Sequence, residues 1–182
     1  MSQHGLSVVI PVFNKEASLH ELIERLLLLF QSESREAEII LVNDGSADRS
    51  WEIIESLAEA NACVRGLELM RNYGQHNALL CGIRVARYDV IVTMDDDLQN
   101  PPEEVPRLLR KLAEGYDVVY GTPRRQTHGV FRNMASWLTK LALQSAMGVA
   151  TARNLSAFRV FRAHLREAFV NYSGHYVSID VC

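Results

Sequence analysis

The sequence predicts an α/β fold in which a mostly parallel sheet is flanked by helices. Two observations lead to this prediction. Strand-like and helix-like segments alternate as far as residue 122, with the spacing of βαβ units. The strand-like runs are apolar throughout and do not alternate with polar residues. Such strands are typical of parallel sheets, because helices cover both faces of these sheets.

The first strand and helix are expected near the N-terminus. Residues 6–12 (LSVVIPV) form a short apolar run rich in β-branched side chains, which predicts a buried strand. Residues 18–30 carry apolar side chains at helical spacing, and Ser18 and Glu21 have the spacing of a capping box. Together these segments predict the first strand–helix unit.

The same unit repeats along the chain. A strand at 37–43 precedes a helix at 48–60, and a strand at 64–69 precedes a helix at 75–86. A fourth strand is expected at 89–94. Ligands of such sheets bind beyond the carboxyl ends of the strands, so polar residues at those ends are candidates for a site.

The next helix has a marked start. Asn100 can cap a helix that begins at Pro101, carries Glu103 in its first turn and ends near residue 114. Residues 116–122 predict a fifth strand. The rest is less regular, with a loop at 122–130, a long helix near 132–147, the run 155–161 and a further helical stretch.

Composition and charge exclude several classes of protein. The 182 residues predict a single domain, and the net charge of −3 argues against a nucleic-acid partner bound by bulk electrostatics. Three cysteines without CxxC spacing favour a reducing compartment. We find no signal peptide and no apolar run of the roughly 18 residues that a spanning helix needs. The last residues, HYVSIDVC, begin another element and stop, so we expect a C-terminally truncated chain.

Three aspartates follow the fourth strand. A solvated loop with helix-capping acids is the structural alternative. Asp95 and Asp97 occupy alternate positions, however, so both can point to one side while Asp96 points elsewhere. Converging carboxylates repel unless a hard cation lies between them, and Mg²⁺ or Mn²⁺ prefers such ligands and also holds substrate phosphates. We therefore predict a cation at Asp95 and Asp97 that carries the diphosphate of a nucleoside diphosphate leaving group.

Polar residues also follow the first two strands. The carboxylate of Asp44 can accept hydrogen bonds from a nucleobase, whereas a turn at Gly45 with Ser46 or Asp48 as a helix cap explains the rest of NDGSADRS. Asn14 follows the first strand, where a plain loop explains it equally well. The first strand is followed by no GxGxxG, and the chain contains no GxxxxGK[ST], which disfavours a dinucleotide site and excludes a P-loop.

Three further segments carry groups that suit an anion. RNYGQHNA (71–78) places several polar side chains at a helix start, although a polar helix cap explains them as well. His76 could be a base, but a lone histidine is more often structural. GTPRRQTHGVFR (121–132) supplies arginines that can grip phosphates or form a solvated basic loop. SAFRVFR (156–162) places two arginines among aromatics, and its structural alternative is a surface strand with snorkelling side chains.

Five motifs in order resemble one family. VVIPVFN, LVNDGS, RNYGQHNA, MDDDLQNPPEE and GYDVVYGT resemble the family 2 inverting glycosyltransferases, more narrowly the bacterial polyprenyl-phosphate glycosyltransferases and the relatives that make dolichyl-phosphate mannose. RNYGQH and DLQNPPEE are most similar to the branch that transfers aminoarabinose to undecaprenyl phosphate. The resemblance covers about residues 6–162. Each motif is weak alone, whereas five at this spacing are specific.

The resemblance implies a GT-A fold and a metal-dependent inverting transferase. Its donor would be a nucleotide-diphospho-sugar, with a UDP-sugar favoured, and Mg²⁺ or Mn²⁺ would lie at Asp95 and Asp97. Arg159 would bind the acceptor phosphate and, with the two aspartates, form the catalytic set. The residues implied for the nucleotide sugar are Pro11, Phe13, Asn14, Glu16, Asp44, Asp96 and Arg124.

The resemblance also implies partners and a location. The acceptor would be a lipid phosphate, and the full-length protein would lie at the cytoplasmic, inner face of a membrane; an oligomer is left open. Two departures bear on this. Lys15 stands where relatives often carry Glu, so that Glu16 would substitute for it, and ARNLS (152–156) lacks an acid that relatives usually carry. The membrane helices that usually follow this domain are absent from the sequence.

The implied chemistry is a single displacement with inversion. A lipid phosphate is already an anion, so no strong general base is needed, and positioning and charge stabilisation are the protein's tasks. The helix near 132–147 is expected to pack in the core, or, in the sharper hypothesis, to place Trp137 at a membrane interface. The alternatives are a nucleotide-sugar-binding domain without turnover and a sugar-phosphate nucleotidylyltransferase, although PVFNKEAS lacks the Gly-rich loop that the latter needs.

Overall fold

The computed structural model describes residues 5–33, 35–121 and 158–167. Within these ranges the strands form one six-stranded sheet in the order β3-β2-β1-β4-β6-β5. The strands are β1 (Leu6–Val12), β2 (Ala37–Asn43), β3 (Val64–Glu68), β4 (Val90–Thr93), β5 (Val118–Tyr120) and β6 (Arg159–Arg162). The helices are α1 (Leu19–Glu33), α2 (Ser50–Ala60), α3 (Gln75–Val85) and α4 (Val105–Ala113), with short 3₁₀ turns η1 (Pro102–Glu104) and η2 (Ala163–Arg166).

The sheet is mostly parallel, as the sequence predicts. β1 lies at its centre and pairs in parallel with β2 and β4, and β3 pairs in parallel with β2. The exception is β6, which is inserted between β4 and β5 and runs antiparallel to both. The carboxyl ends of β1, β2, β3 and β4 therefore meet at one edge of the sheet, and the antiparallel β6 begins at that same edge.

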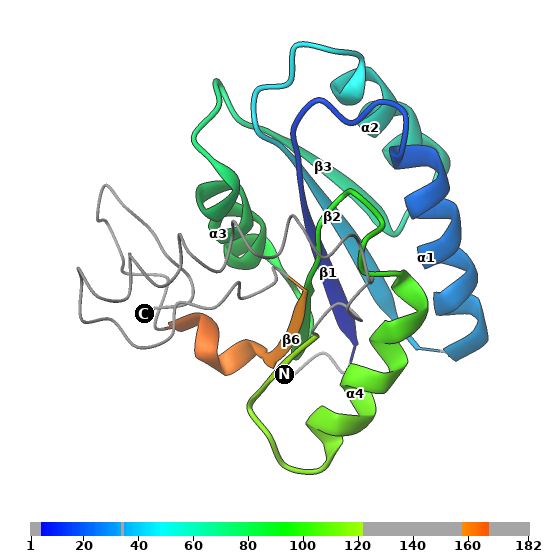
Figure 1. Cartoon of the computed structure of the whole chain (residues 1–182), viewed down its shortest axis with the longest axis vertical. Coiled ribbons are helices and arrows are strands. Elements are labelled where there is room, and N and C mark those ends of the chain that lie inside the picture. The colour runs from blue at the N-terminus through cyan, green and yellow to red at the C-terminus, as the bar shows by residue number, and fades with distance from the viewer. Residues whose placement is uncertain (1–4, 34, 122–157, 168–182) are drawn as a thin grey trace, which may run out of the picture.

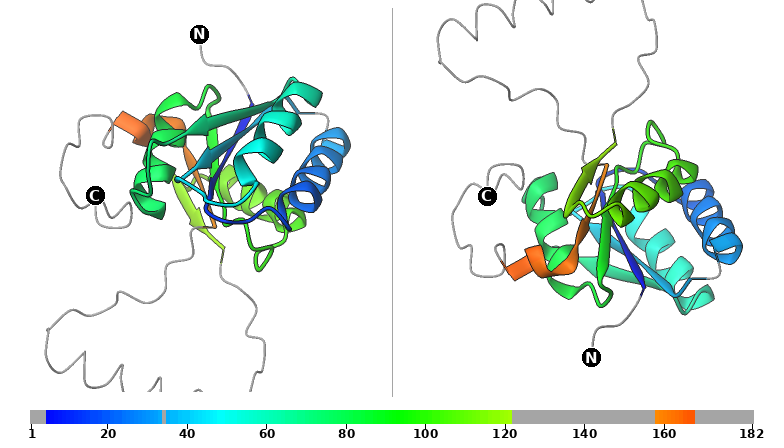
Figure 2. Two further views of the ribbon diagram at one scale, coloured as in Figure 1. Left: turned by 90° about the horizontal axis from the view of Figure 1, so that it is seen from above. Right: turned by 90° about the horizontal axis from the view of Figure 1, so that it is seen from below.

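Helices cover both faces of the sheet. α1, α2 and α4 pack on one face, and α3 covers the other (Figure 1). Viewed from above and from below, η2 lies next to α3 (Figure 2), where Leu165 packs against the same apolar cluster. The strands alternate between the two layers, as Val8 and Ile10 join the α1 face and Val9 the α3 face. All three side chains are fully buried because both faces are covered.

The helices that support the site follow their predicted spans with small differences. α1 buries Leu19, Leu22, Ile23 and Leu26, a stripe at helical spacing. The predicted capping box is wrong, because Ser18 donates its hydroxyl to the carbonyl oxygens of Lys15 (3.4 Å) and Asp96 (3.0 Å). The structure thus uses Ser18 to tie the start of α1 to the aspartate loop.

The helix expected from Pro101 begins one residue later and differently. Pro101 is extended, η1 forms the first turn, and α4 follows at Val105. A proline disfavours the helical conformation in the residue before it, and Pro102 directly follows Pro101, which explains the late start. The side chain of Asn100 is buried beside this turn. None of the helices in the described ranges combines the length and the apolar character needed to span a bilayer.

Several expectations concern residues outside the described ranges. These are the loop at 122–130 with Arg124 and Arg125, the helix near 132–147 with Arg132 and Trp137, and the ARNLS segment. The run expected at 155–161 is described only from Phe158 onward, where it enters β6.

Candidate active site at the carboxyl edge of the sheet

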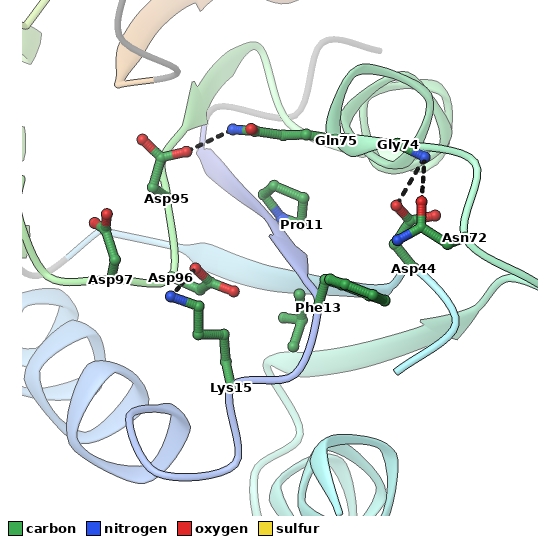
Figure 3. A pocket seen from close by; sticks show the side chains of 11 residues that line it. Pro11, Phe13, Lys15, Asp44, Asn72, Gly74, Gln75, Asp95, Asp96 and Asp97 are labelled. Carbon is green, nitrogen blue, oxygen red and sulfur yellow. Dashed lines mark hydrogen bonds and ion pairs between the residues drawn. The ribbon is translucent and has the colours of Figure 1, made fainter. Parts of the chain in front are cut away.

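A cavity of about 300 Å³ lies at the carboxyl edge of the parallel strands (Figure 3). Four loops contribute to its walls, those that follow β1, β2, β3 and β4. The lining residues are Pro11, Val12, Phe13, Lys15, Asp44, Asn72, Gly74, Gln75, Asp95, Asp96 and Asp97. Sequence-predicted residues from three separate strands thus meet around one space, as expected for a parallel sheet of this kind.

The aspartate triplet is arranged as its alternation predicts. Asp95 and Asp97 extend to the same side of the loop after β4, whereas Asp96 turns the other way, toward Lys15 (Figure 3). The loop is fixed at its start because Met94 donates its N–H to the carbonyl of Val9 on β1 (3.2 Å). Asp95 and Asp97 therefore face different neighbours from those of Asp96.

Asp95 is partly buried and lies beside two other carboxylates. Burial raises its pKa, and the nearby charges of Asp97 and Asp96 raise it further. A hydrogen bond from the side chain of Gln75 opposes this increase: Nε2 of Gln75 lies 2.6 Å from Oδ1 of Asp95. The charged form of Asp95 is thus disfavoured by burial and by its acidic neighbours, and it is stabilised by a neutral donor.

Asp96 is held by the loop after β1. Its carboxylate lies 3.5 Å from the ammonium of Lys15 and accepts a hydrogen bond from the backbone N–H of Phe13. Burial raises the pKa of Asp96, and Lys15 acts against that increase. Because its charge already has a cationic partner, Asp96 is less suited than its neighbours to bind a metal ion.

The residues present fit a divalent cation whose coordination would be completed by the phosphates of a bound substrate. Asp97 accepts a hydrogen bond from the N–H of Gln99 (3.0 Å), and its side chain is exposed. No group of three or more metal-binding side chains exists among the described residues. Mg²⁺ is commonly held by one or two carboxylates together with substrate phosphates, which matches the pair Asp95 and Asp97. The cavity has four carboxylates and one ammonium in its lining, so a diphosphate cannot enter favourably without added positive charge.

Asp44 occupies the opposite side of the cavity. It is 3% exposed, and its two oxygens accept the backbone N–H groups of Tyr73 (2.7 Å) and Gly74 (2.9 Å). The same Gly74 N–H also reaches Oδ1 of Asn72 (3.0 Å). Asp44 therefore fixes the loop after β3, and its carboxylate keeps further lone pairs for a ligand.

Asn14 and Glu16 lie away from the cavity lining. Asn14 adopts a left-handed backbone (φ 54°) and exchanges hydrogen bonds with Ser46 and Ala47. Glu16 accepts the N–H of Arg49 (3.0 Å) and donates its own N–H to Asp48 (3.1 Å). In the structure both residues join the loop after β1 to the loop after β2.

Arg159 lies at the carboxyl edge of the parallel strands, as expected, but it is buried. It pairs with Thr93 across β4 and β6, and its Nε donates to Oγ1 of Thr93 (3.2 Å). Its guanidinium lies 5.9 Å from the ring centre of Tyr120, and the residue is 3% exposed. The alternative of a snorkelling surface arginine is wrong for Arg159, because β6 is an interior strand. Arg159 does not line the cavity.

Comparison with known proteins identifies the fold's relatives. The model for the family described as Glycosyl transferase family 2 matches residues 7–172. The chain belongs to glycosyltransferase family 2. This confirms the resemblance found in the sequence and favours a glycosyltransferase over the nucleotidylyltransferase alternative.

Several curated relatives of this family 2 chain have the same name. An undecaprenyl-phosphate 4-deoxy-4-formamido-L-arabinose transferase of Pseudomonas paraeruginosa is 45% identical over 166 residues, which are 91% of this chain and 49% of that protein. The enzyme of the same name from Serratia proteamaculans is 41% identical over 91% of this chain and 51% of its own length. The chain therefore spans about half the length of these relatives.

Solved structures share the fold of the family 2 domain. Glucosyl-3-phosphoglycerate synthase of Mycobacterium tuberculosis, in complex with Mn²⁺, UDP and phosphoglyceric acid, has a TM-score of 0.62 and 25% identity, covering 89% of this chain and 57% of that one. S. aureus TarS in complex with UDP-GlcNAc has a TM-score of 0.60 and 19% identity, covering 90% and 47%. Both likenesses agree with the predicted GT-A architecture.

Three cavity residues of the family 2 domain were harder to anticipate from the sequence. Lys15 stands out there only as a departure from relatives, and Asn72 and Gln75 belong to the RNYGQHNA motif, for which a polar helix cap was a sufficient explanation. The available signal was position, because this motif follows the third parallel strand, whose carboxyl end lies at the same edge as those of the other strands.

Proposed function

We propose that this chain is the donor-binding part of a metal-dependent inverting glycosyltransferase. The enzyme would move a sugar from a UDP-sugar to undecaprenyl phosphate. Family membership supports the reaction class, and the names of the curated relatives support the acceptor. The observation that carries the proposal is the convergence of Asp44, Asp95 and Asp97 on one cavity. A similar structure with UDP and Mn²⁺ supports the donor and the metal.

The donor's nucleoside is assigned to the side of the cavity near Asp44. Asp44 is buried and held rigid by two backbone N–H groups, which suits recognition of a base through the remaining lone pairs. Phe13 is 44% exposed on the cavity wall and offers an aromatic surface beside it. Pro11 completes this wall, and Asn14 and Glu16 act from behind by fixing the loops.

The diphosphate is assigned to the side of the cavity near the aspartate triplet. Asp95 and Asp97 would hold Mg²⁺ or Mn²⁺, while Asp96 stays paired with Lys15. The cation, when bound, neutralises the charge that develops on the departing nucleoside diphosphate. Lys15 is our second candidate for a positive charge near these phosphates, because it also lines the cavity.

The acceptor is assigned to the edge next to β6. A lipid phosphate is an anion at neutral pH and needs no strong base, so the protein's task is to hold it in line with the anomeric carbon. Arg159 is our candidate for that task, because it pairs with Thr93, which lies two residues before Asp95 in the sequence. An acceptor in a membrane would place the full-length protein at the inner, cytoplasmic membrane face.

Thermal unfolding with UDP tests this proposal. We expect UDP with Mn²⁺ to stabilise the chain by roughly 2.7 kcal/mol at 100 times Kd, which corresponds to about 5–10 °C at roughly 2–4 °C per kcal/mol. UDP with EDTA should stabilise it much less, and Asp95→Asn with Asp97→Asn should remove the difference. Equal stabilisation of the wild type with Mn²⁺ and with EDTA would count against the metal role.

A further inference from the structure

The side chain of Gln75 connects the two ends of the cavity. Gln75 is the first residue of α3, and its carboxamide extends across the cavity to Asp95, with Nε2 2.6 Å from Oδ1 (Figure 3). The two residues before it, Tyr73 and Gly74, are held by Asp44 through their backbone N–H groups. Three consecutive residues thus link the carboxylate after β2 to a carboxylate after β4.

The partners of the triplet differ in charge. Asp96 is paired with the ammonium of Lys15, whereas Asp95 receives a neutral amide and Asp97 a backbone N–H. A neutral donor orients a carboxylate without cancelling its charge, so the carboxylate remains attractive to a cation. A cationic partner would compete with the metal ion for the same oxygens.

The hydrogen bond also distinguishes the two oxygens of Asp95. Oδ1 accepts one hydrogen bond from Gln75 and keeps one lone pair, whereas both lone pairs of Oδ2 remain available. Outer residues that orient a ligating carboxylate are known to affect metal affinity strongly.

We propose that Gln75 is a positioning residue that presents Oδ2 of Asp95 to the divalent cation and couples cation binding to the nucleoside end of the cavity. This inference rests on the proposed function, because it requires a cation at Asp95 and Asp97. In this role Gln75 acts through Asp95 and is not itself a ligand of the cation. Its effect should therefore appear in cation affinity and in the coupling between Mn²⁺ and UDP, since coupling between two ligands is reciprocal.

Titration of the 182-residue chain with Mn²⁺ tests the inference, with free Mn²⁺ measured by its electron paramagnetic resonance signal. Gln75→Met removes the donor while it keeps an unbranched side chain of the same length, and Gln75→Ala removes both. We expect both variants to weaken Mn²⁺ binding roughly 10-fold in the presence of UDP. UDP affinity measured by calorimetry in EDTA should stay within about twofold of the wild type, which a general structural defect would not allow.

His76→Ala is the matched control. His76 is exposed in the same helical turn and does not line the cavity, so its removal should leave both affinities unchanged. Unchanged or tighter Mn²⁺ binding in the Gln75 variants would overturn the inference while the proposed function stands. A loss of UDP affinity in EDTA as large as the loss of Mn²⁺ affinity would also overturn it, because Gln75 would then have a general structural role. A wild type that binds no Mn²⁺ with UDP would overturn the proposed function, and this inference with it.

Discussion

Individual polar side chains determine the geometry of this site through their hydrogen bonds. Asp44 shows how: a carboxylate that is almost completely buried is tolerated because two backbone N–H groups satisfy its oxygens. The loop after β3 is thereby pinned at Tyr73 and Gly74. The same side chain serves the fold and, in our proposal, the donor, so substitutions at Asp44 should affect both.

Asp44→Asn should reveal the structural part of this role. A carboxamide has only one acceptor oxygen, so its NH₂ group would face one of the two backbone N–H donors. We expect a loss of about 1–3 kcal/mol in the free energy of unfolding, measured by urea denaturation without ligand. Asn72→Ala is the control, because Asn72 is exposed and shares the Gly74 N–H with Asp44, and it should cost less than about 0.5 kcal/mol. If Asp44→Asn proves as stable as the wild type, these two hydrogen bonds contribute little.

Elements of the fold reach the cavity through loops that are packed against one another. Gly45 follows Asp44 with a positive φ of 70°, and a Cβ there would lie 2.6 Å from the backbone C of Arg71 and the backbone N of Asn72. The loop after β2 therefore fits directly against the loop after β3. This close approach, together with the contacts of Asn14 and Glu16, makes three loops one unit.

Gly45→Ala tests that packing. The substitution combines a strained φ with a backbone clash, and we expect it to lower the free energy of unfolding by roughly 2–4 kcal/mol. Gly115→Ala is matched to it, since Gly115 has a φ of 106° but nothing within 4 Å of its Cβ position. The control should cost about 1–2 kcal/mol from φ strain alone, as measured by urea denaturation. Equal costs for the two variants would mean that the neighbouring loop gives way.

An ion pair ties α1 to the turn that follows the aspartate loop. Glu103 in η1 accepts from Nε (2.9 Å) and Nη2 (2.6 Å) of Arg25, and this hydrogen bonding lowers the pKa of Glu103. A lowered folded-state pKa means that the contribution to stability is present above the unfolded value, about 4.3. It is lost as the pH falls through the folded-state pKa.

The coupling between Arg25 and Glu103 should therefore depend on pH. We expect a double-mutant cycle with Arg25→Gln and Glu103→Gln to give at most about 1 kcal/mol at pH 7, because solvent screens this partly exposed pair. The coupling should be smaller at pH 3 than at pH 7, as measured by urea denaturation of the wild type and the variants at both pH values. A coupling energy that is the same at both pH values would contradict the ionic origin of this contact.

At the scale of the whole molecule, the parallel half of the fold could be predicted and the antiparallel part could not. Apolar runs such as 6–12 and 37–43 are best explained as buried strands, and their alternation with helices determines the shared edge. The position of β6 depends on pairing with Thr93, far away in sequence, and no local pattern specifies that pairing. The direction of β6 was for this reason not predicted.

The site was predictable to the same extent. The alternation of Asp95 and Asp97 follows from backbone geometry, so their common side could be derived. The role of Gln75 requires a contact between residues twenty positions apart on different elements, which sequence spacing cannot supply. Asn14 and Glu16 illustrate the reverse. Position suggested the cavity for Asn14, and the family resemblance suggested it for Glu16, but the side chains of both contact a neighbouring loop.

The insertion of β6 has a consequence for synthesis on the ribosome. β5 ends at Tyr120, yet the strand that joins it to β4 begins at Arg159. At about 5–20 residues per second, the ribosome needs roughly 2–8 s to make the intervening chain. During that interval β4 is an edge strand whose outer backbone N–H and C=O groups are unpaired. Such edges can pair with strands of other chains. The nascent chain is thus expected to expose this unpaired strand after all the residues that line the cavity have been translated and before its sheet is complete.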